Sequence, residues 1–164
     1  MAGQQREISL RFLAEPTDVN FGGKVHGGTV MKWIDQAGYA AAVGWSGRYC
    51  VTVAVGGIRF LHPVLIGDLV SVNAKLIFTG TSSLHFAIDV MTRDLKSDAQ
   101  RLTTHCVIVF VAVDPESGKP VAVPAWEPVS ERDRELAAYA LRIKELSTHV
   151  EQEAANHLPG PAAP

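Results

Sequence analysis

Residues 20–42 read NFGGKVHGGTVMKWIDQAGYAAA and join a turn-rich loop to an apolar helix. The glycines and Asn20 predict a loop over residues 20–28. The apolar side chains that follow recur at helical spacing until a glycine-rich end near residue 47. One carboxylate, Asp35, lies within this apolar helix. Because burying a lone carboxylate costs several kcal/mol unless it has partners, we expect Asp35 to have a chemical role.

The composition is that of an ordinary globular chain. A length of 164 residues fits one domain, and a net charge of −2 excludes the basic footprint of a nucleic-acid-binding protein. No apolar run approaches the ~20 residues of a membrane span, and the first residues lack an apolar signal core. We therefore expect a cytoplasmic protein without nucleic-acid or membrane partners. Cys50 and Cys106 lack metal or redox spacing, so we expect reduced core cysteines and no metal site.

Residues outside the helix predict a sheet of five strands. Gly56 and Gly57 interrupt the second strand, which indicates a bulge or a close backbone approach. The last strand is nearly all apolar, which is typical of a central strand. Short connections among the final four strands predict an antiparallel meander and a two-layer α+β fold. One helix leaves one sheet face open, and oligomerisation would cover it. The predicted strands span residues 7–14, 50–61, 70–78, 84–90 and 104–113.

The C-terminal part predicts a proline-rich segment and then an amphipathic helix over residues 130–153. Ser130 is placed to cap this helix, with acidic residues in its first turn. We expect the helix to pack on its own domain or on a neighbouring subunit. The expected organisation is a main domain over 1–128, the helical segment over 129–157 and a frayed tail over 158–164.

Five separated motifs resemble one known family. They are PTDVNFGGKVHGG (16–28), KWIDQAG (32–38), VTVAVGGIRFLHPVLIGD (51–68), GTSS (80–83) and FVAVDPESGKPVAVP (110–124). In this order they resemble the acyl-CoA thioesterases of the hotdog fold, in particular the cytosolic, YciA-like acyl-CoA hydrolases. The resemblance implies an antiparallel sheet of about five strands wrapped around one long central helix. It also implies homodimers with active sites at the dimer interface, often assembled as trimers of dimers. Coenzyme A would be part of the substrate and product, and no cofactor is expected.

The resemblance assigns roles to the loop and the helix. Backbone amides of Gly27 and Gly28, free at a helix start, would bind the thioester oxyanion. Asp35 would act as general base or as nucleophile, which the sequence leaves open. Asn20 would orient the water or the carbonyl, and His26 would bond the thioester oxygen or hold the loop. Gly27 and Asp35 are about 12 Å apart along one helix at 1.5 Å per residue, so two antiparallel helices in a dimer would form one site.

Structural roles remain open for each of these residues. Asp35 could be satisfied at a dimer seam by the backbone or by a threonine, and Asn20 could be a left-handed turn residue. His26 could hold the loop, and the glycines could serve close packing. We expect three further histidines in strand patterns to be satisfied structural groups: His62, His85 and His105.

Coenzyme A carries phosphates, and several residues could contact them. The candidates are Arg59, the loop of Thr81, Ser82 and Ser83, and Arg93 or Arg101. Two other functions compete with hydrolysis of aliphatic acyl-CoA. One is a phenylacetyl-type aryl-CoA thioesterase, and the other is a non-catalytic acyl-CoA sensor, which would bind without turnover. A hotdog dehydratase is disfavoured, because no histidine follows Asp35 by four or five residues.

Overall fold

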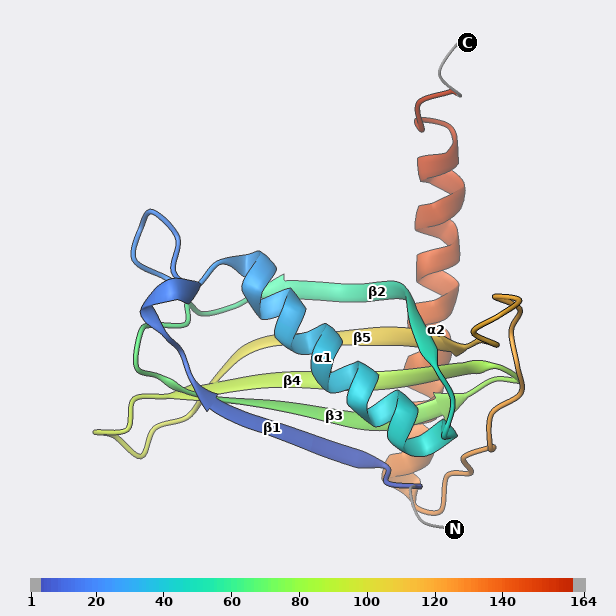
Figure 1. Cartoon of the computed structure of the whole chain (residues 1–164), viewed down its shortest axis with the longest axis horizontal. Helices are drawn as coiled ribbons and strands as arrows, with labels where there is room; N and C mark the ends of the chain where they lie inside the picture. Colours follow the sequence, from blue (N-terminus) through green and yellow to red (C-terminus); the bar gives the residue numbers. More distant parts are fainter. Residues whose placement is uncertain (1–3, 161–164) are drawn as a thin grey trace.

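The structure of the chain is a computed structural model that describes residues 4–160. Five strands form one antiparallel sheet, and the helix α1 lies along one face of it (Figure 1). This arrangement confirms the expected α+β hotdog fold. In chain order the elements are β1 (Glu7–Leu13), a 3-10 turn (Pro16–Asp18), α1 (Gly27–Ser46), β2 (Cys50–Phe60), β3 (Leu69–Thr79), β4 (Ser83–Arg93), β5 (Arg101–Ala112) and α2 (Glu131–Ala155).

The strand order is β1-β3-β4-β5-β2, so the predicted four-strand meander is wrong for β2. β3, β4 and β5 do form a meander. However, β2 pairs with β5 at the far edge, because α1 carries the chain across the sheet before β2 begins. The apolar strand β5 is an inner strand as expected, although β4 holds the centre. β2 therefore has one edge without a strand partner in the described chain.

The paired glycines of β2 form the irregularity that the sequence predicts. The register of β2 against β5 shifts between Gly56 and Arg59, and Gly57 adopts a left-handed φ of 68°. Only glycine takes that conformation at little cost. Gly56 has a second role that the strand pattern does not reveal. A Cβ on it would lie 2.8 Å from Ile143 Cγ2, so α2 crosses β2 in direct contact with its backbone.

The main core lies between α1 and the sheet face that it covers. Val30, Ile34, Ala37 and Ala41 recur at helical spacing on α1 and are buried. Their packing on the sheet is close: a Cβ on Gly38 would lie 2.6 Å from the Phe110 ring. Burial of this stripe provides most of the driving force for docking α1.

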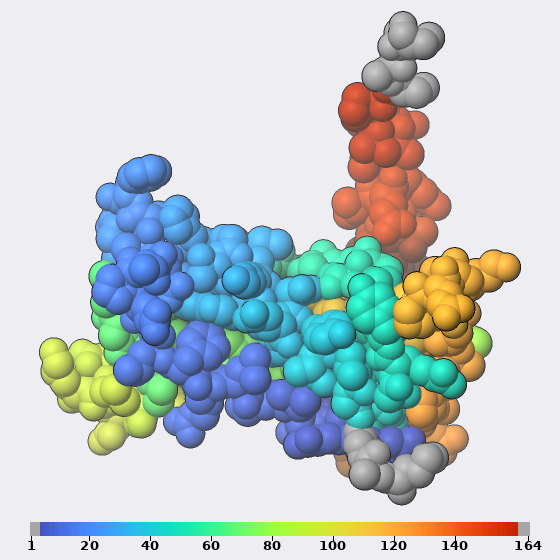
Figure 2. Space-filling view, in the orientation of Figure 1, coloured from blue at the N-terminus to red at the C-terminus, as the bar shows by residue number. Residues whose placement is uncertain are grey.

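α2 covers part of the opposite sheet face, so it packs on its own domain, which is one of the two expected placements. The expectation that this face is left open within one chain is wrong for the covered part. Ala140 is fully buried against Ile77, Ala87 and Val107. Ser130 caps the helix as predicted: its side chain accepts from the Asp133 amide at 3.0 Å. The second half of α2 extends beyond the sheet as an isolated column (Figures 1 and 2). Of the predicted tail, residues 161–164 lie outside the described residues.

Arg6 joins the two ends of the described chain. Its guanidinium pairs with Asp133 at 2.6 Å and stacks on Trp126 at 4.4 Å from the ring centroid. Its Nε donates to the carbonyl of Leu76 at 3.0 Å. One side chain thus connects the start of β1, the end of β3, the proline-rich segment and the first turn of α2. None of the helices in residues 4–160 is long and apolar enough to cross a membrane.

Candidate active site

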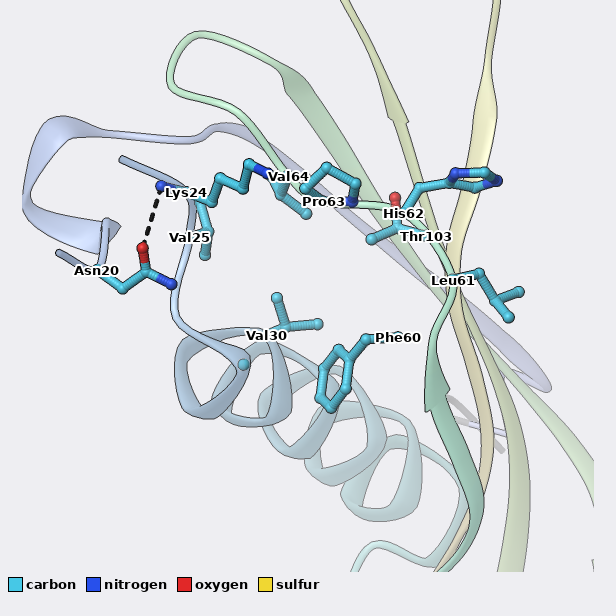
Figure 3. Close-up of a pocket in the computed structure, with 11 residues that line it drawn as sticks. Asn20, Lys24, Val25, Val30, Phe60, Leu61, His62, Pro63, Val64 and Thr103 are labelled. Carbon is cyan, nitrogen blue, oxygen red and sulfur yellow. Dashed lines mark hydrogen bonds between the residues drawn. The ribbon is translucent and has the colours of Figure 1, made fainter. Parts of the chain in front are cut away.

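The loop before α1 is held together by Asn20. Its side-chain oxygen accepts hydrogen bonds from the amides of Gly22, at 2.9 Å, and Lys24, at 3.3 Å. Figure 3 draws the bond to Lys24. Asn20 has a negative φ, so the left-handed turn that the sequence left open is absent here, and Gly23 takes that conformation instead. Because the oxygen is occupied by the loop, the amide NH₂ is the part of Asn20 that is available to bind an oxygen of a ligand.

The start of α1 opens into a cavity of about 390 Å³. Asn20 and Gly27 line it, and the side chains of Val30 and Phe60 lie next to each other on its α1 side (Figure 3). The amides of Gly27 and Gly28 belong to the first helical turn, whose N–H groups lack partners within the helix and face the positive end of its dipole. A Cβ on Gly27 would come within 3.4 Å of the Phe60 ring, and one on Gly28 would meet nothing within 4 Å.

His26 occupies the N-cap position of α1. Its backbone accepts from the Val30 amide and donates to the Asp18 carbonyl, while its exposed side chain does not cap the helix. His62 lies at the rim of the same cavity. It follows the end of β2 and is exposed, so the expectation of a satisfied strand histidine is wrong for His62.

Asp35 does not line this cavity. It lies in a second cavity, of about 410 Å³, between α1 and β2. Its side chain accepts a hydrogen bond from the hydroxyl of Thr52 on β2. Asp35 is exposed in the single chain, so the expected burial within the helix is wrong: α1 buries the stripe that faces the sheet and turns Asp35 toward β2 and the solvent. Met31, Val55 and Ile58 give this cavity apolar walls.

The two cavities are separate within one chain. Asn20 and Gly27 line the first, while Gly28, Asp35 and Thr52 line the second. Asp35 follows Gly27 by about 12 Å along the axis of one helix at 1.5 Å per residue. The candidate donors and the candidate base therefore do not converge on one atom within a single chain.

The residues expected to bind coenzyme A do not gather in one place. Thr81, Ser82 and Ser83 form the β3–β4 turn, whereas Arg93 ends β4, roughly 33 Å away along an 11-residue strand. Arg59 lies near the end of β2, opposite His105. Coenzyme A binding by these residues stays a prediction. Arg101 is already engaged, because it pairs with the buried Asp68 at 2.8 Å.

Two strand histidines lie on the α2 side of the sheet. His105 is satisfied as expected: Nδ1 lies 2.7 Å from Asp89 and Nε2 lies 2.9 Å from the Tyr139 hydroxyl of α2. His85 is only partly satisfied, since its buried Nδ1 has no partner within residues 4–160. Burial, followed by the charge of Lys144, lowers the pKa of His85 to about 4. His85 is therefore a neutral core group at neutral pH.

The cysteines are free and buried, as the sequence predicts. Burial raises the pKa of both thiols, that of Cys106 to about 12, with Asp89 as a second cause. Neither thiol is thus a nucleophile at neutral pH. Within the described residues no three histidine, cysteine or acidic side chains are grouped to hold a metal ion.

Thr52 is the site residue that sequence reasoning missed. It alternates with valines in a predicted strand, so nothing in the local pattern distinguishes it from a polar residue on a solvated face. Its link to Asp35 spans 17 residues and depends on how β2 lies against α1.

An apolar helix cradled by a five-stranded antiparallel sheet is the architecture expected of the hotdog fold. The comparisons with known proteins agree. A family profile described as the thioesterase superfamily matches residues 22–99. The acyl-CoA thioester hydrolase YciA of Escherichia coli is 39% identical over 123 residues, which cover 73% of this chain and 92% of that protein. The chain therefore belongs to the acyl-CoA thioester hydrolases of the thioesterase superfamily.

Solved structures extend the likeness. An acyl-CoA hydrolase from Staphylococcus aureus, in complex with butyryl coenzyme A and coenzyme A, has a TM-score of 0.82 at 26% identity and covers 92% of each chain. A hexameric thioesterase from Yersinia pestis has a TM-score of 0.67 at 38% identity, covering 71% of this chain and 94% of that one. The S. aureus hydrolase was also solved with an asparagine, an aspartate or a threonine replaced by alanine.

Proposed function

We propose that this chain hydrolyses acyl-CoA thioesters to the free acid and coenzyme A, in an active site shared by two copies. The observation that carries the proposal is the Asp35–Thr52 hydrogen bond at an open apolar cavity, with unoccupied helix-start amides about 12 Å away. The spacing of the replaced residues in the S. aureus hydrolase supports it. There the aspartate follows the asparagine by fifteen residues and the threonine follows the aspartate by seventeen. Asn20, Asp35 and Thr52 have the same two spacings here.

Asp35 is the group that handles the proton. Thr52 donates to one carboxylate oxygen and so fixes the orientation of the carboxylate. The other oxygen is left to take a proton from water, which then attacks the thioester carbon, or to attack that carbon directly. In either route the C–S bond breaks, water supplies the oxygen of the acid, and its proton ends on the sulfur of coenzyme A.

The opposite end of the site stabilises the negative oxygen. The Gly27 and Gly28 amides point out of the first turn of α1, where the dipole favours an anion. A donor of this kind contributes on the order of 3 kcal/mol to transition-state stabilisation. The free NH₂ of Asn20 lines the same cavity as Gly27 and can hold the carbonyl oxygen or the water.

A second copy brings the two ends together. The outer edge of β2 has no strand partner among the described residues. Antiparallel pairing at this edge would place the α1 helices antiparallel as well, with Gly27 of one chain near Asp35 of the other. Assembly of such dimers into a trimer of dimers is part of the proposal, and the hexameric Y. pestis thioesterase supports it.

The direct test is steady-state hydrolysis of a panel of acyl-CoAs, from acetyl to palmitoyl with phenylacetyl and benzoyl, followed by thiol release. Asp35→Asn should lower kcat at least about 100-fold. The exposed Asp98→Asn is the matched control and should keep the wild-type rate. Thr52→Val should lower kcat, and Thr52→Ser should restore it by returning the hydroxyl. A normal rate for Asp35→Asn would refute the assignment, and binding without turnover of any thioester would indicate a sensor.

Complementation tests the shared site. Asp35→Asn and Gly27→Val chains are each expected to be inactive alone. A mixed dimer would contain one site with both residues intact. Random co-refolding makes half of the dimers mixed, so about a quarter of the wild-type rate should return if each site acts independently. No recovery in a verified mixed dimer would contradict the cross-subunit arrangement.

A further inference from the structure

The second half of α2 leaves an apolar surface uncovered. Leu146 and Val150 are 59% and 67% exposed, although they continue the stripe that buries Ala140 lower on the same helix. With Val53 and Val55 of β2 they line a groove of about 520 Å³. We name this surface the α2 overhang groove. It lies on the sheet face opposite the candidate active site.

The length of α2 shows what the overhang is positioned to cover. A 25-residue helix is about 37 Å long, whereas a five-stranded sheet is only about 19 Å wide at 4.8 Å per strand. α2 starts at the β1 edge, where Asp133 binds Arg6, and crosses β2 at Gly56. It therefore extends past the β2 edge by roughly 18 Å. That is close to the width of four further strands joined at this edge.

The crossing point also suits a two-fold arrangement. Gly56 is the seventh of the eleven residues of β2, one residue beyond its middle residue, Val55. If two β2 strands pair antiparallel about Val55 or Ala54, the two crossing points lie about 7 or 14 Å apart along the strands. The axes of two packed helices lie 8–10 Å apart, a distance that falls between these two values. The two-fold would also make the neighbouring α2 helices antiparallel.

We propose that the α2 overhang groove is a docking surface for a second copy of this chain, in which the α2 helix of each copy packs on the outer sheet face and on the α2 of the other. The inference rests on the proposed shared site, because it uses the same β2 edge. It adds that the C-terminal helix, on the face away from the reaction, holds the dimer together.

The area that a dimer needs supports this role. A stable interface buries about 800 Å² on each partner. The edge of an eleven-residue strand, about 37 Å long and 10 Å thick, offers roughly half of that. Surfaces above and below the edge must supply the rest. The α1–β2 cavity lies on one face and the overhang groove on the other, and Val55 lines both.

The test compares two leucines of α2 in the full-length protein. Leu146→Glu places a charge in the groove, whereas Leu141→Glu places one on an exposed position of the same helix outside it. By sedimentation velocity over a concentration series, Leu146→Glu should raise the dimer dissociation constant at least about 100-fold. Leu141→Glu should change it less than about threefold. Circular dichroism should show both variants folded, because both side chains are exposed in the single chain.

A cross-link gives a second measurement that does not depend on weakening the protein. Leu146→Cys, three residues beyond the crossing at Ile143, should form a covalent dimer with a short bismaleimide, whereas Leu141→Cys, outside the groove, should not; the two native thiols are buried. The proposal is overturned if Leu146→Glu leaves the dimer intact or if Leu146→Cys fails to cross-link within an intact dimer. In that case successful complementation by Asp35 and Gly27 variants would leave the proposed function standing. Conversely, loss of the dimer in Leu146→Glu with a normal rate in Asp35→Asn would refute the mechanism and leave the docking surface.

Discussion

Acidification should destabilise this fold through His85. The side chain is only 3% exposed and packs edge-on against Phe78, with ring centroids 5.2 Å apart. Its one hydrogen bond within residues 4–160 joins Nε2 to the Ser83 hydroxyl at 3.3 Å. Burial and then the charge of Lys144 lower its pKa from 6.5 to about 4. Protonation in the folded state is therefore strongly disfavoured.

The sign and size of the change in unfolding free energy follow from the linkage between folding and protonation of His85. In the unfolded chain His85 takes up its proton near pH 6.5, well before the folded protein does. The stability contributed by the neutral side chain is thus fully present above pH 6.5. It is lost progressively as the pH falls toward the folded pKa of about 4. At about 1.36 kcal/mol per pH unit, the loss between pH 6.5 and pH 5 is about 2 kcal/mol.

Urea unfolding at about pH 8 and about pH 5 measures this loss. One protein concentration must be used throughout, because association would shift the midpoint. The wild type should lose about 2 kcal/mol more than His85→Gln between the two pH values. His149→Gln, at an exposed position on α2, should follow the wild type. Equal losses in the wild type and His85→Gln would refute the reasoning.

Three further predictions concern packing, capping and thiol reactivity. Gly38→Ala should lower Tm in a thermal melt, because its Cβ would lie 2.6 Å from the buried Phe110 ring. The overpacking costs about 1–3 kcal/mol, which outweighs the gain in helix propensity of about 1 kcal/mol. A higher Tm would contradict this packing. Ser130→Ala should lower the free energy of unfolding by about 1 kcal/mol in urea, through loss of the cap, and an unchanged value would show that the cap is dispensable. Cys50 and Cys106 should not react with Ellman's reagent in the native protein and should both react after denaturation, whereas rapid native labelling would contradict their burial.

Local patterns predicted most elements of the fold. The loop of glycines before α1 and the glycines after it placed the helix within a residue or two of Gly27–Ser46. Turn residues separated the strands, and Ser130 placed the start of α2. These features depend on neighbours in sequence, so one sequence is enough to find them.

The errors arose where distant segments meet. Short loops predicted that β2 joins the meander, but the helix crossing carries it to the other edge, beside β5. The apolar composition of α1 suggested a buried Asp35, although composition does not say which face of a helix meets the sheet. The partner Thr52 and the contact of Gly56 with Ile143 likewise depend on tertiary packing.

The contacts of Arg6 couple the stability of β1 to that of the first turn of α2. Opening the first turn of α2 would leave Arg6 without Asp133, and fraying of β1 would take Arg6 away from both Asp133 and Trp126. Local fluctuations at these sites should therefore be cooperative, as in a single unit of partial unfolding. Amides of β1 and of the first turns of α2 should then exchange their hydrogens with similar protection, despite more than a hundred residues of intervening sequence. A nascent chain could complete this unit only after residue 133 has been synthesised, so β1 would stay loosely held until the first turn of α2 has been made.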